Sequence, residues 1–521
     1  MRWLLPVGIQ DFVKIREDSF LYIDKTAKIS ELLSDGGGCF FLSRPRRFGK
    51  SLLCSTLAAL FEGRQELFSG LAIEKTDWEW KKHPVIRIDL NAGNYKAGLP
   101  ILVSMLSNML SNTALDYGLN IRGQYPAEQL LNIIKDLHAL FHERVVVIID
   151  EYDKPLLETL EDASLNSDIR NELKAFYGVL KSCDAYLRFV FVTGVSKFAH
   201  VSVFSDLNQL VDLSLNPIYA DICGITQQEL ETNFAPEIDA VLHETGVSRR
   251  WYLDELRRFY NGYRFSEKAL TVYNPFGLLN HFYNHGKFFE YWYETGSPAF
   301  LITLIENQNI NILNLNRMRV RLDDFRKYDI QNMRAEPVLY QTGYLTIADY
   351  DSDMEEFILD WPNEEVRGAF ARSLLDHYLR PSAESAQELH TELPRALYYG
   401  KIDTAKTYIQ AMMATIPYDI IKDTECYFQT VIHLIFTMLG FKCRSEVRIA
   451  AGRIDTLVET KNYVYCFEFK LHGSAEEALA QIDTKDYLLP WKGSGKTLVK
   501  VGVSFDSQKR NISDWKSVRS E

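Results

Sequence analysis

The sequence lacks the features of several large protein classes. It has only seven cysteines, dispersed along 521 residues and without a CxxC pair, which indicates reduced thiols and neither a disulfide framework nor a zinc site. No apolar run approaches the roughly 18 residues of a membrane span. The apolar stretch Trp3–Ile9 is short, contains Pro6 and has no small-residue cleavage site, unlike a signal peptide. We expect a cytoplasmic protein with no membrane association.

The sequence also lacks an overall basic charge. It has 58 Lys and Arg against 70 Asp and Glu, a net charge of −12, which argues against a surface coated in basic nucleic-acid-binding residues. The charge is uneven, however. Residues 421–521 carry 15 basic and 13 acidic side chains, whereas the other 420 residues carry 43 and 57. This near-neutral tail leaves room for a local basic groove.

What is present is an α/β pattern. Hydrophobic residues make up 46% and charged residues 25% of the chain, as in ordinary globular proteins, and the length predicts three or four domains. In the first two hundred residues β-rich runs alternate with helical patterns such as 101–110 and 128–143, which predicts a mostly parallel sheet. The expected strands are Cys39–Ser43, Val85–Leu90, Val145–Asp150, Leu187–Thr193 and, more weakly, Leu210–Leu215.

The pattern changes twice further along the chain. Helices rich in aromatic residues follow, with a β-like passage at 338–350; two interpretations of this middle region, a lid and a winged-helix-like unit, stay open. The tail reads as helix 425–439, β-like runs 442–449, 455–459 and 463–469, helix 475–488 and strand 497–505. We therefore predict four parts: an α/β domain over 1–224, a helical region over 225–382, a helical connector over 383–416 and a second α/β domain over 417–521.

The first candidate site follows the strand Cys39–Ser43. Gly49, Lys50 and Ser51 come directly before a helical run. In a nucleotide-binding loop the glycine lets the backbone approach a phosphate, the lysine reaches the β and γ oxygens, and the serine hydroxyl binds Mg²⁺. The first glycine of GxxxxGKS is missing, because position 44 is arginine. On its own the GKS tripeptide is equally the start of an ordinary polar helix.

The strand Val145–Asp150 supplies the second half of this site. A buried parallel strand that ends in Asp150 is where such folds hold Mg²⁺, and Glu151 is placed to polarise the attacking water. The structural alternative is an acidic pair that caps the next helix. Asp153 and Lys154 read as a surface ion pair. Thr193 lies where a γ-phosphate sensor would lie, or simply in a turn before Gly194. The predicted ligands are ATP and Mg²⁺.

A different group of residues lies in the tail. Asp455 is followed thirteen residues later by Glu468, and Lys470 lies two residues beyond it on the same predicted strand face. Two carboxylates of this kind hold Mg²⁺, or alternatively Mn²⁺, against a phosphodiester, and the lysine orients or activates the attacking water. The structural alternative is a cross-strand ion pair between Glu468 and Lys470.

Several short motifs resemble a known family. The N-terminal half is similar to the AAA-ATPase-like family common in bacteria, which also lacks the first glycine of the phosphate loop. The matching motifs are YIDKT (Tyr22–Thr26), RPRRFGKS (Arg44–Ser51), IDEYDKP (Ile149–Pro155), YNGYRF (Tyr260–Phe265), YNPF (Tyr273–Phe276), YWYETG (Tyr291–Gly296) and YQTGYLTI (Tyr340–Ile347). The resemblance implies a P-loop NTPase sheet that binds ATP.

The tail resembles the PD-(D/E)XK nuclease domain that often accompanies this ATPase. The resemblance adds Glu425 as a further metal carboxylate and Gln481 as a residue that positions water or nucleic acid. It implies an ATP-dependent or ATP-regulated nuclease that acts on nucleic acid, with DNA favoured over RNA. The alternative is a nucleotide switch whose C-terminal domain binds nucleic acid or a partner without cleaving it. Whether the chain forms a homo-oligomer is left open by the sequence.

Overall fold

The computed structural model describes residues 3–34, 38–197, 204, 209–293, 299–308, 310, 315, 317–321, 324, 334–379, 392–414, 424–439, 441–506, 508 and 511–520. The chain divides into two compact units. One comprises residues 1–295 and 317–363, and the other comprises residues 296–316 and 364–521. The finer four-part division stays a prediction, and residues 383–391 and 415–416 of the expected connector lie outside the described residues.

The first unit is built on a parallel five-stranded sheet of order β2-β3-β4-β1-β5. Its strands are β1 (Cys39–Ser43), β2 (Val85–Asp89), β3 (Val145–Asp150), β4 (Leu187–Gly194) and β5 (Val211–Asp212). All residues of β1 and β3 are buried, as expected where helices cover both faces of a parallel sheet. The predicted strands are confirmed, although β5 is only two residues long.

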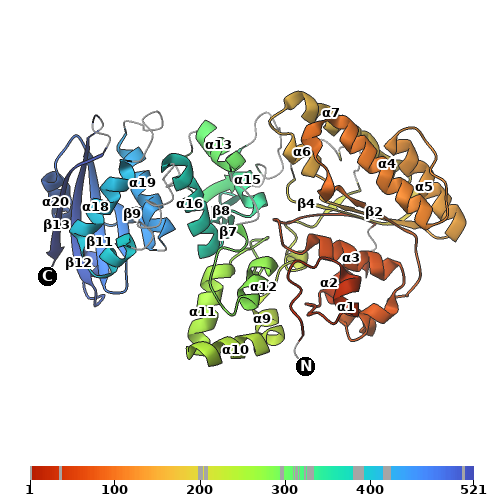
Figure 1. The fold of residues 1–521 in the computed structure, drawn as a ribbon, viewed down its shortest axis with the longest axis horizontal. Helices are drawn as coiled ribbons and strands as arrows, with labels where there is room; N and C mark the ends of the chain where they lie inside the picture. Colours follow the sequence, from red (N-terminus) through yellow and green to blue (C-terminus); the bar gives the residue numbers. More distant parts are fainter. Residues whose placement is uncertain are drawn as a thin grey trace. The chain divides into compact units, whose positions relative to one another are not determined.

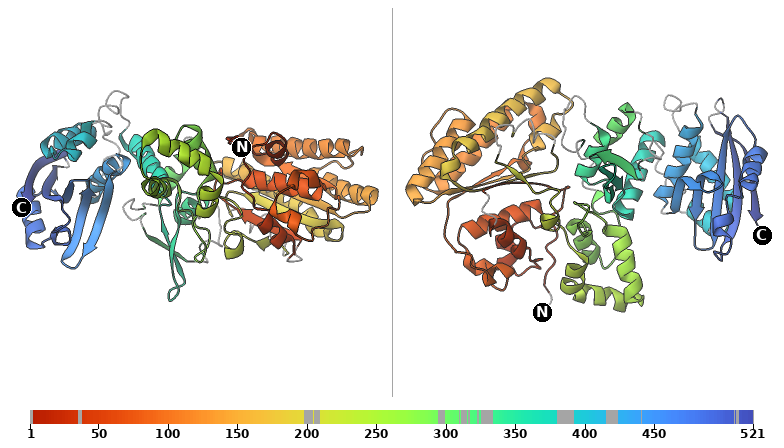
Figure 2. Two further views of the ribbon diagram at one scale, coloured as in Figure 1. Left: turned by 90° about the horizontal axis from the view of Figure 1, so that it is seen from below. Right: turned by 180° about the vertical axis from the view of Figure 1, so that it is seen from behind.

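Helices cover both faces of this sheet (Figures 1 and 2). On one face lie α1 (Phe12–Glu17), α2 (Thr26–Ser34) and α3 (Lys50–Phe61), and on the other lie α4 (Leu99–Asp116), α5 (Pro126–Phe141) and α7 (Ala163–Ser182). The short α6 (Lys154–Glu158) follows β3. Leucine and isoleucine side chains of α4, α5 and α7 pack with isoleucine and valine side chains of β2, β3 and β4 in one buried cluster. This core fixes the carboxyl ends of the strands, where ligands of parallel sheets bind.

The middle region of the first unit is mainly helical. It contains α9 (Gln227–Asn233), α10 (Ala235–Thr245), α11 (Arg249–Tyr260) and α12 (Pro275–Tyr283), which share a core rich in aromatic rings. It also contains a small antiparallel sheet of order β6-β8-β7, and α15 (Ala335–Thr342) lies in the chain between its strand β6 (Met318–Arg321) and its strands β7 (Thr346–Asp351) and β8 (Glu356–Asp360). The predicted β-like passage 338–350 was therefore wrong at its start. Residues 338–342 are helical, and the helix ends at Gly343, whose φ is +91°.

The second unit contains a mixed five-stranded sheet of order β13-β12-β11-β10-β9. Its elements are α13 (Ala299–Asn307), α16 (Glu364–Leu379), α18 (Ile402–Met413), α19 (Glu425–Met438), β9 (Lys442–Ile449), β10 (Gly452–Glu459), β11 (Tyr463–Leu471), α20 (Ala475–Thr484), β12 (Thr497–Asp506) and β13 (Asn511–Ser520). Only β11 and β12 pair in parallel, and α20 is the crossover between them. The predicted strands are confirmed, α20 ends before residue 488, and β13 was not expected.

The two faces of β11 have different neighbours. Phe467 and Phe469 point to the side of α19, where the Phe436 ring lies 5.2 Å from that of Phe467. Cys466, on the opposite face, packs with Ile482 of α20. Because side chains alternate along a strand, Glu468 and Lys470 share the face of Cys466. Among the helices that the structure describes, none is long and apolar enough to span a membrane.

Candidate functional sites

The loop between β1 and α3 holds Gly49, Lys50 and Ser51. Gly49 precedes the helix with a φ of +91°, and a Cβ atom there would meet no other atom within 4 Å. Glycine is therefore required by the left-handed backbone and not by lack of space. The Lys50 side chain is 3% exposed, and its Nζ donates to the carbonyl oxygens of Arg44 at 3.2 Å and Pro45 at 3.3 Å.

The end of β3 brings two carboxylates to this loop. Asp150 is buried and accepts a hydrogen bond from Ser51, and burial together with the neighbouring Glu151 raises the pKa of Asp150 to about 6. The Glu151 Oε1 atom lies 3.3 Å from Lys50 Nζ. Glu151 has a φ of +51°, a left-handed conformation that is uncommon for a residue with a side chain and recurs at functional sites. Four predicted residues, Lys50, Ser51, Asp150 and Glu151, thus lie together.

Thr193 and Asp153 depart from the simplest expectations. Thr193 is buried at the end of β4, and its hydroxyl donates to the Leu42 carbonyl oxygen at 2.8 Å, so the hydroxyl ties β4 to β1. The surface ion pair expected for Asp153 was wrong. Asp153 is completely buried and accepts from Val195 N, Ser196 N and Ser196 Oγ. Burial raises its pKa to about 6.

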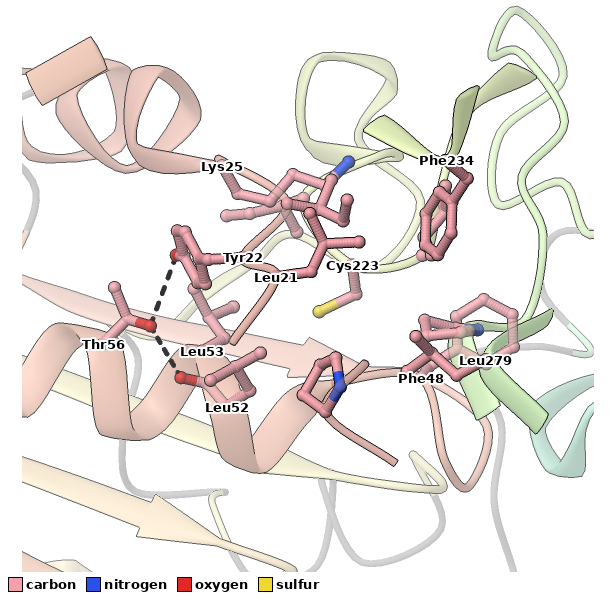
Figure 3. A pocket seen from close by; sticks show the side chains of 17 residues that line it. Leu21, Tyr22, Lys25, Phe48, Leu52, Leu53, Thr56, Cys223, Phe234 and Leu279 are labelled. Atoms are coloured by element: carbon pink, nitrogen blue, oxygen red, sulfur yellow. Dashed lines mark hydrogen bonds between the residues drawn. The ribbon is translucent and has the colours of Figure 1, made fainter. Parts of the chain in front are cut away.

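An apolar cavity of about 100 Å³ flanks the start of α3 (Figure 3). Tyr22 and Thr56 lie on one side of it, Phe48 and Phe234 on the other, and Cys223 points its sulfur between them. Most of its other lining side chains are aliphatic, and they come from the N-terminal segment, α3 and the middle region. The cavity therefore offers a flat or apolar group a place beside Gly49.

A second cavity, of about 180 Å³, lies at Ser51 and Asp150. Asp11 and Asp89 also line it, together with Arg87. Asp89 pairs with Asp150 in the register of β2 and β3, so both carboxylates lie at the carboxyl edge of the sheet. The polar cavity and the apolar cavity thus lie beside the same turn of α3, which begins at Lys50.

In the second unit, β10 and β11 separate at the predicted carboxylates. The last paired residues of the two strands are Thr456 and Phe467. Asp455 and Glu468 are the next residues outward on each strand and are not paired with each other. There the Asp455 Oδ2 atom accepts a hydrogen bond from the Phe469 backbone N–H at 2.8 Å. The Asp455 carboxylate thus takes the place of a backbone carbonyl as the acceptor for β11. Glu468 is 1% exposed, and its Oε2 atom has no hydrogen-bond partner.

Lys470 and Gln481 extend this cluster. Lys470 Nζ lies 3.3 Å from Glu468 Oε1 and donates to Gln481 Oε1 at 2.9 Å. Gln481 in turn donates to the hydroxyl of Tyr487 at 3.3 Å. Glu425, at the start of α19, accepts from the Leu471 N–H at 3.1 Å. These contacts place all five predicted residues around the point where β10 and β11 separate. Tyr487 was missed, because nothing in the local sequence shows that the turn after α20 returns to Gln481.

The electrostatics of this cluster fit a cation. Burial, followed by the proximity of Asp455, raises the pKa of Glu468, and burial raises the pKa of Asp455. Within the described parts of the chain, no group of three or more His, Cys, Asp or Glu side chains is arranged around one metal position. Mg²⁺, however, is commonly held by one or two carboxylates with water completing its octahedron. Asp455 and Glu468, with the unpartnered Oε2 atom, match that requirement.

Comparison with known proteins assigns the chain to a family. A model described as "Predicted AAA-ATPase" matches residues 6–204, and a model of the PD-(D/E)XK nuclease superfamily matches residues 423–515. An uncharacterized protein from the vnfD 5′ region of Azotobacter chroococcum mcd 1 is 35% identical over 519 residues, covering 98% of this chain and 97% of that protein. The chain belongs to the AAA-ATPase-like family, with a PD-(D/E)XK nuclease superfamily domain at its C-terminal end.

The two matches coincide with the two sites. The AAA-ATPase-like match contains Lys50 and Asp150, and the PD-(D/E)XK match contains Asp455, Glu468 and Lys470. The parallel sheet of the first unit is therefore a P-loop ATPase sheet. A structure of the Aeropyrum pernix ORC2 protein in ADPNP–ADP complexes matches 67% of this chain and 92% of that chain at 12% identity, with a TM-score of 0.25, and no inference is drawn from it.

Proposed function

We propose that this AAA-ATPase-like protein is a metal-dependent nuclease whose activity is regulated by ATP binding and hydrolysis. The observation that carries the proposal is the Glu468 carboxylate. It is almost fully buried, one of its oxygens has no partner, and it lies beside Asp455 and Lys470. Buried carboxylates of purely structural function are normally saturated with hydrogen bonds, so the free oxygen favours a ligand.

The structural alternative, an ion pair between Glu468 and Lys470, explains less. The pair occupies only Glu468 Oε1, at 3.3 Å, while Lys470 makes its shorter contact with Gln481. A buried ion pair is stabilising only when its geometry is good and its remaining polar atoms are satisfied. Glu468 Oε2 is not satisfied. The Asp455 carboxylate raises the pKa of Glu468. If Glu468 and Lys470 formed only a structural ion pair, the repulsion between the two carboxylates would destabilise the fold with no compensating gain.

Each residue then has a defined part in phosphodiester hydrolysis. Asp455 and Glu468 would hold the divalent ion, which polarises the phosphate and lowers the pKa of a coordinated water. The Phe469 N–H, bonded to Asp455 Oδ2, fixes that carboxylate and leaves its second oxygen for the ion. Lys470 supplies a compact positive charge for the attacking water or the phosphate. Gln481 and Tyr487 hold the Lys470 ammonium in place.

The first unit would bind ATP at the start of α3. Lys50 would exchange its contacts with loop carbonyls and Glu151 for the β and γ phosphate oxygens, since a charged phosphate is the stronger acceptor. Ser51 and Asp150 would hold Mg²⁺, and Glu151 would polarise the attacking water. The apolar cavity beside Gly49 would receive the base. Thr193 would support the phosphate loop indirectly, because its hydroxyl donates to the Leu42 carbonyl oxygen of β1, the strand that leads into that loop.

The test is a cleavage assay of the purified full chain on single- and double-stranded DNA and RNA, with Mg²⁺ or Mn²⁺, and with and without ATP. We expect metal-dependent cleavage that ATP changes in rate, and a loss of at least about 100-fold in Lys470→Ala. Lys461→Ala is the matched control, because Lys461 is exposed in the turn between β10 and β11. Binding of nucleic acid without cleavage by the wild type would favour a nucleotide switch instead.

A further inference from the structure

Arg44 occupies the position at which loops of the GxxxxGKS type have their first glycine. Its side chain is only 1% exposed. Among the residues that the structure describes, no carboxylate forms an ion pair with it, and burial lowers the pKa of its guanidinium. A buried charge without a counter-charge is expensive and needs compensation from hydrogen bonds. Arg44 is therefore a built feature of the loop and not a surface residue that replaced a glycine.

Backbone carbonyl groups provide the compensation. Arg44 Nη1 donates to the carbonyl oxygens of Ser43 at 2.8 Å and Ser214 at 3.0 Å, and Nη2 donates to those of Tyr219 at 3.1 Å and Ala220 at 3.4 Å. These acceptors lie at the end of β1, just after β5 and in the 3-10 turn η6 (Pro217–Tyr219) with the residue after it. The planar fork of one guanidinium thus joins the end of β1 to two segments that lie 170 or more residues further along the chain.

The middle region contributes the remaining contact. The Arg44 guanidinium carbon lies 4.0 Å from the centre of the Phe265 ring, a cation–π distance. The Arg44 Nε atom has no hydrogen-bond partner, and the Arg44 residue lines a cavity of about 10 Å³ together with Gln341. That volume accommodates about one water molecule. The guanidinium is therefore held on its edges and on its face.

Arg44 also touches both ends of the candidate nucleotide site. Its carbonyl oxygen accepts from Lys50 Nζ, the group expected to bind phosphate. Its guanidinium holds Tyr219 and Ala220, and the chain that follows them lines the apolar cavity with Ile222, Cys223 and Gly224. One residue thus connects the phosphate-binding lysine to one wall of the cavity for the base.

We propose that Arg44 is a positioning residue that fixes the separation between the phosphate loop and the 222–224 wall of the apolar cavity, so that the base and the phosphates of one nucleotide are held together. The inference rests on the proposed nucleotide function. Two subsites held at the correct separation bind a linked ligand far more tightly than either binds its half. Loss of Arg44 should therefore weaken a whole nucleotide much more than a bare polyphosphate, which uses the phosphate loop alone.

The experiment compares two probes by calorimetry on the full chain: a non-hydrolysable ATP analogue and inorganic tripolyphosphate, each with Mg²⁺. In Arg44→Gly, which restores the missing glycine, we expect affinity for the analogue to fall at least about tenfold while that for tripolyphosphate changes less than about threefold. Arg44→Lys should lose less, because lysine keeps the charge but not the planar fork. Arg122→Gly, an exposed arginine paired with Asp136, is the control and should bind both probes normally.

The possible outcomes test the positioning role of Arg44 separately from the proposed nucleotide function. A wild type that binds neither probe would refute the proposed nucleotide function. A wild type that binds both, with Arg44→Gly unchanged or equally weakened for the two, would overturn the positioning inference, because a general structural role predicts no selectivity. If Arg44→Gly lacks a folding transition, the same comparison of the losses of affinity for the analogue and for tripolyphosphate is made with Arg44→Lys. A loss selective for the analogue supports the inference, and an equal loss or no loss overturns it.

Discussion

Two buried carboxylates of this molecule, those of Asp153 and Glu468, differ in how completely they are hydrogen-bonded. Asp153 is completely buried, but three donors from Val195 and Ser196 satisfy it, so it serves to hold the end of β4 beside the end of β3. Glu468 is buried to the same degree but keeps an unpartnered oxygen. Full satisfaction indicates structure, whereas an incomplete shell indicates a ligand. The difference lies in the partners and not in the residue type.

The first prediction concerns the free energy that the buried, incompletely hydrogen-bonded Glu468 carboxylate costs the folded state. Because burial and Asp455 raise the pKa of Glu468, the folded state holds a proton that the unfolded state releases at lower pH. Stability therefore falls as the pH rises from the ordinary glutamate range through the raised value. Without metal, the free energy of unfolding of Glu468→Gln at pH 8 should exceed that of the wild type by on the order of 1 kcal/mol. The difference should be smaller at pH 5, and the variant should not cleave.

A calorimetric scan at the two pH values measures this difference. Glu459→Gln is the matched control in the same sheet, because Glu459 is paired with Arg444 and Lys496. Its loss should leave stability unchanged or slightly lower. A Glu468→Gln variant that is less stable than the wild type at pH 8 would show that the Lys470 ion pair outweighs the repulsion, and would contradict the metal assignment.

The second prediction concerns the phosphate loop and the end of β3. Lys50→Ala removes the ammonium that reaches both the loop carbonyls and Glu151, so nucleotide affinity should fall by at least about tenfold. Glu151→Gln keeps the shape of the side chain but cannot accept the proton of the attacking water. It should bind ATP normally and hydrolyse it about 100-fold or more slowly. Phosphate release and calorimetric titration measure the two effects, and unchanged hydrolysis in both variants would refute the site.

At the scale of elements, β13 can be tested directly, because it forms one edge of the sheet of the second unit. Trp515 of β13 is buried, and its ring lies 5.9 Å from that of Phe467 on the central strand β11. Trp515→Ala should therefore lower the stability of the second unit by roughly 3 kcal/mol. The adjacent Lys516→Ala removes only an exposed ion pair with Glu476 and should cost less than about 1 kcal/mol. Thermal unfolding that distinguishes neither variant from the wild type would show that β13 adds nothing to the fold.

The elements show which structure a local pattern predicts. The continuous apolar run of β1 and the β-branched run of β3 predict buried strands, and each strand is where the sequence indicates. β13 has no such run, because on this edge strand only Ile512 and Trp515 are buried among its described residues. The helix α15 occupies a stretch rich in β-forming residues, because packing overrode their propensity and Gly343 ended the helix.

The site residues divide in the same way. Lys50, Asp150, Asp455 and Glu468 are candidates that the sequence alone offers, because each lies in, or at the end of, a recognisable strand or loop. The sequence alone does not offer the contacts that define their chemistry. The bond from the Phe469 N–H to Asp455 depends on where two strands separate. Two of the acceptors of the Arg44 guanidinium, the carbonyl oxygens of Tyr219 and Ala220, lie 175 and 176 residues away along the chain. Such contacts follow from tertiary packing and leave no local signal.

At the scale of the whole molecule, each unit has its own core, and the chain crosses between them more than once. Residues 296–316 belong to the second unit, residues 317–363 return to the first, and the second unit resumes at residue 364. A fragment built on one sheet must carry the segments that contact that sheet and its helices. For the sheet of β9 to β13, those segments begin well before residue 417.

The last prediction compares two fragments of the second unit, 364–521 and 417–521. The shorter one, whose start follows the sequence pattern, loses the Leu397 carbonyl that accepts from the buried Tyr465 hydroxyl at 2.6 Å, and loses Gln410 of α18, which bonds Ile512 and Asn511 of β13. An unsatisfied buried hydroxyl alone costs about 1–3 kcal/mol. The longer fragment should thus unfold cooperatively and retain metal-dependent cleavage, while the shorter one should be at least about 2 kcal/mol less stable in urea. Equal stability of the two would mean that α16 and α18 are dispensable and that the boundary lies near residue 417.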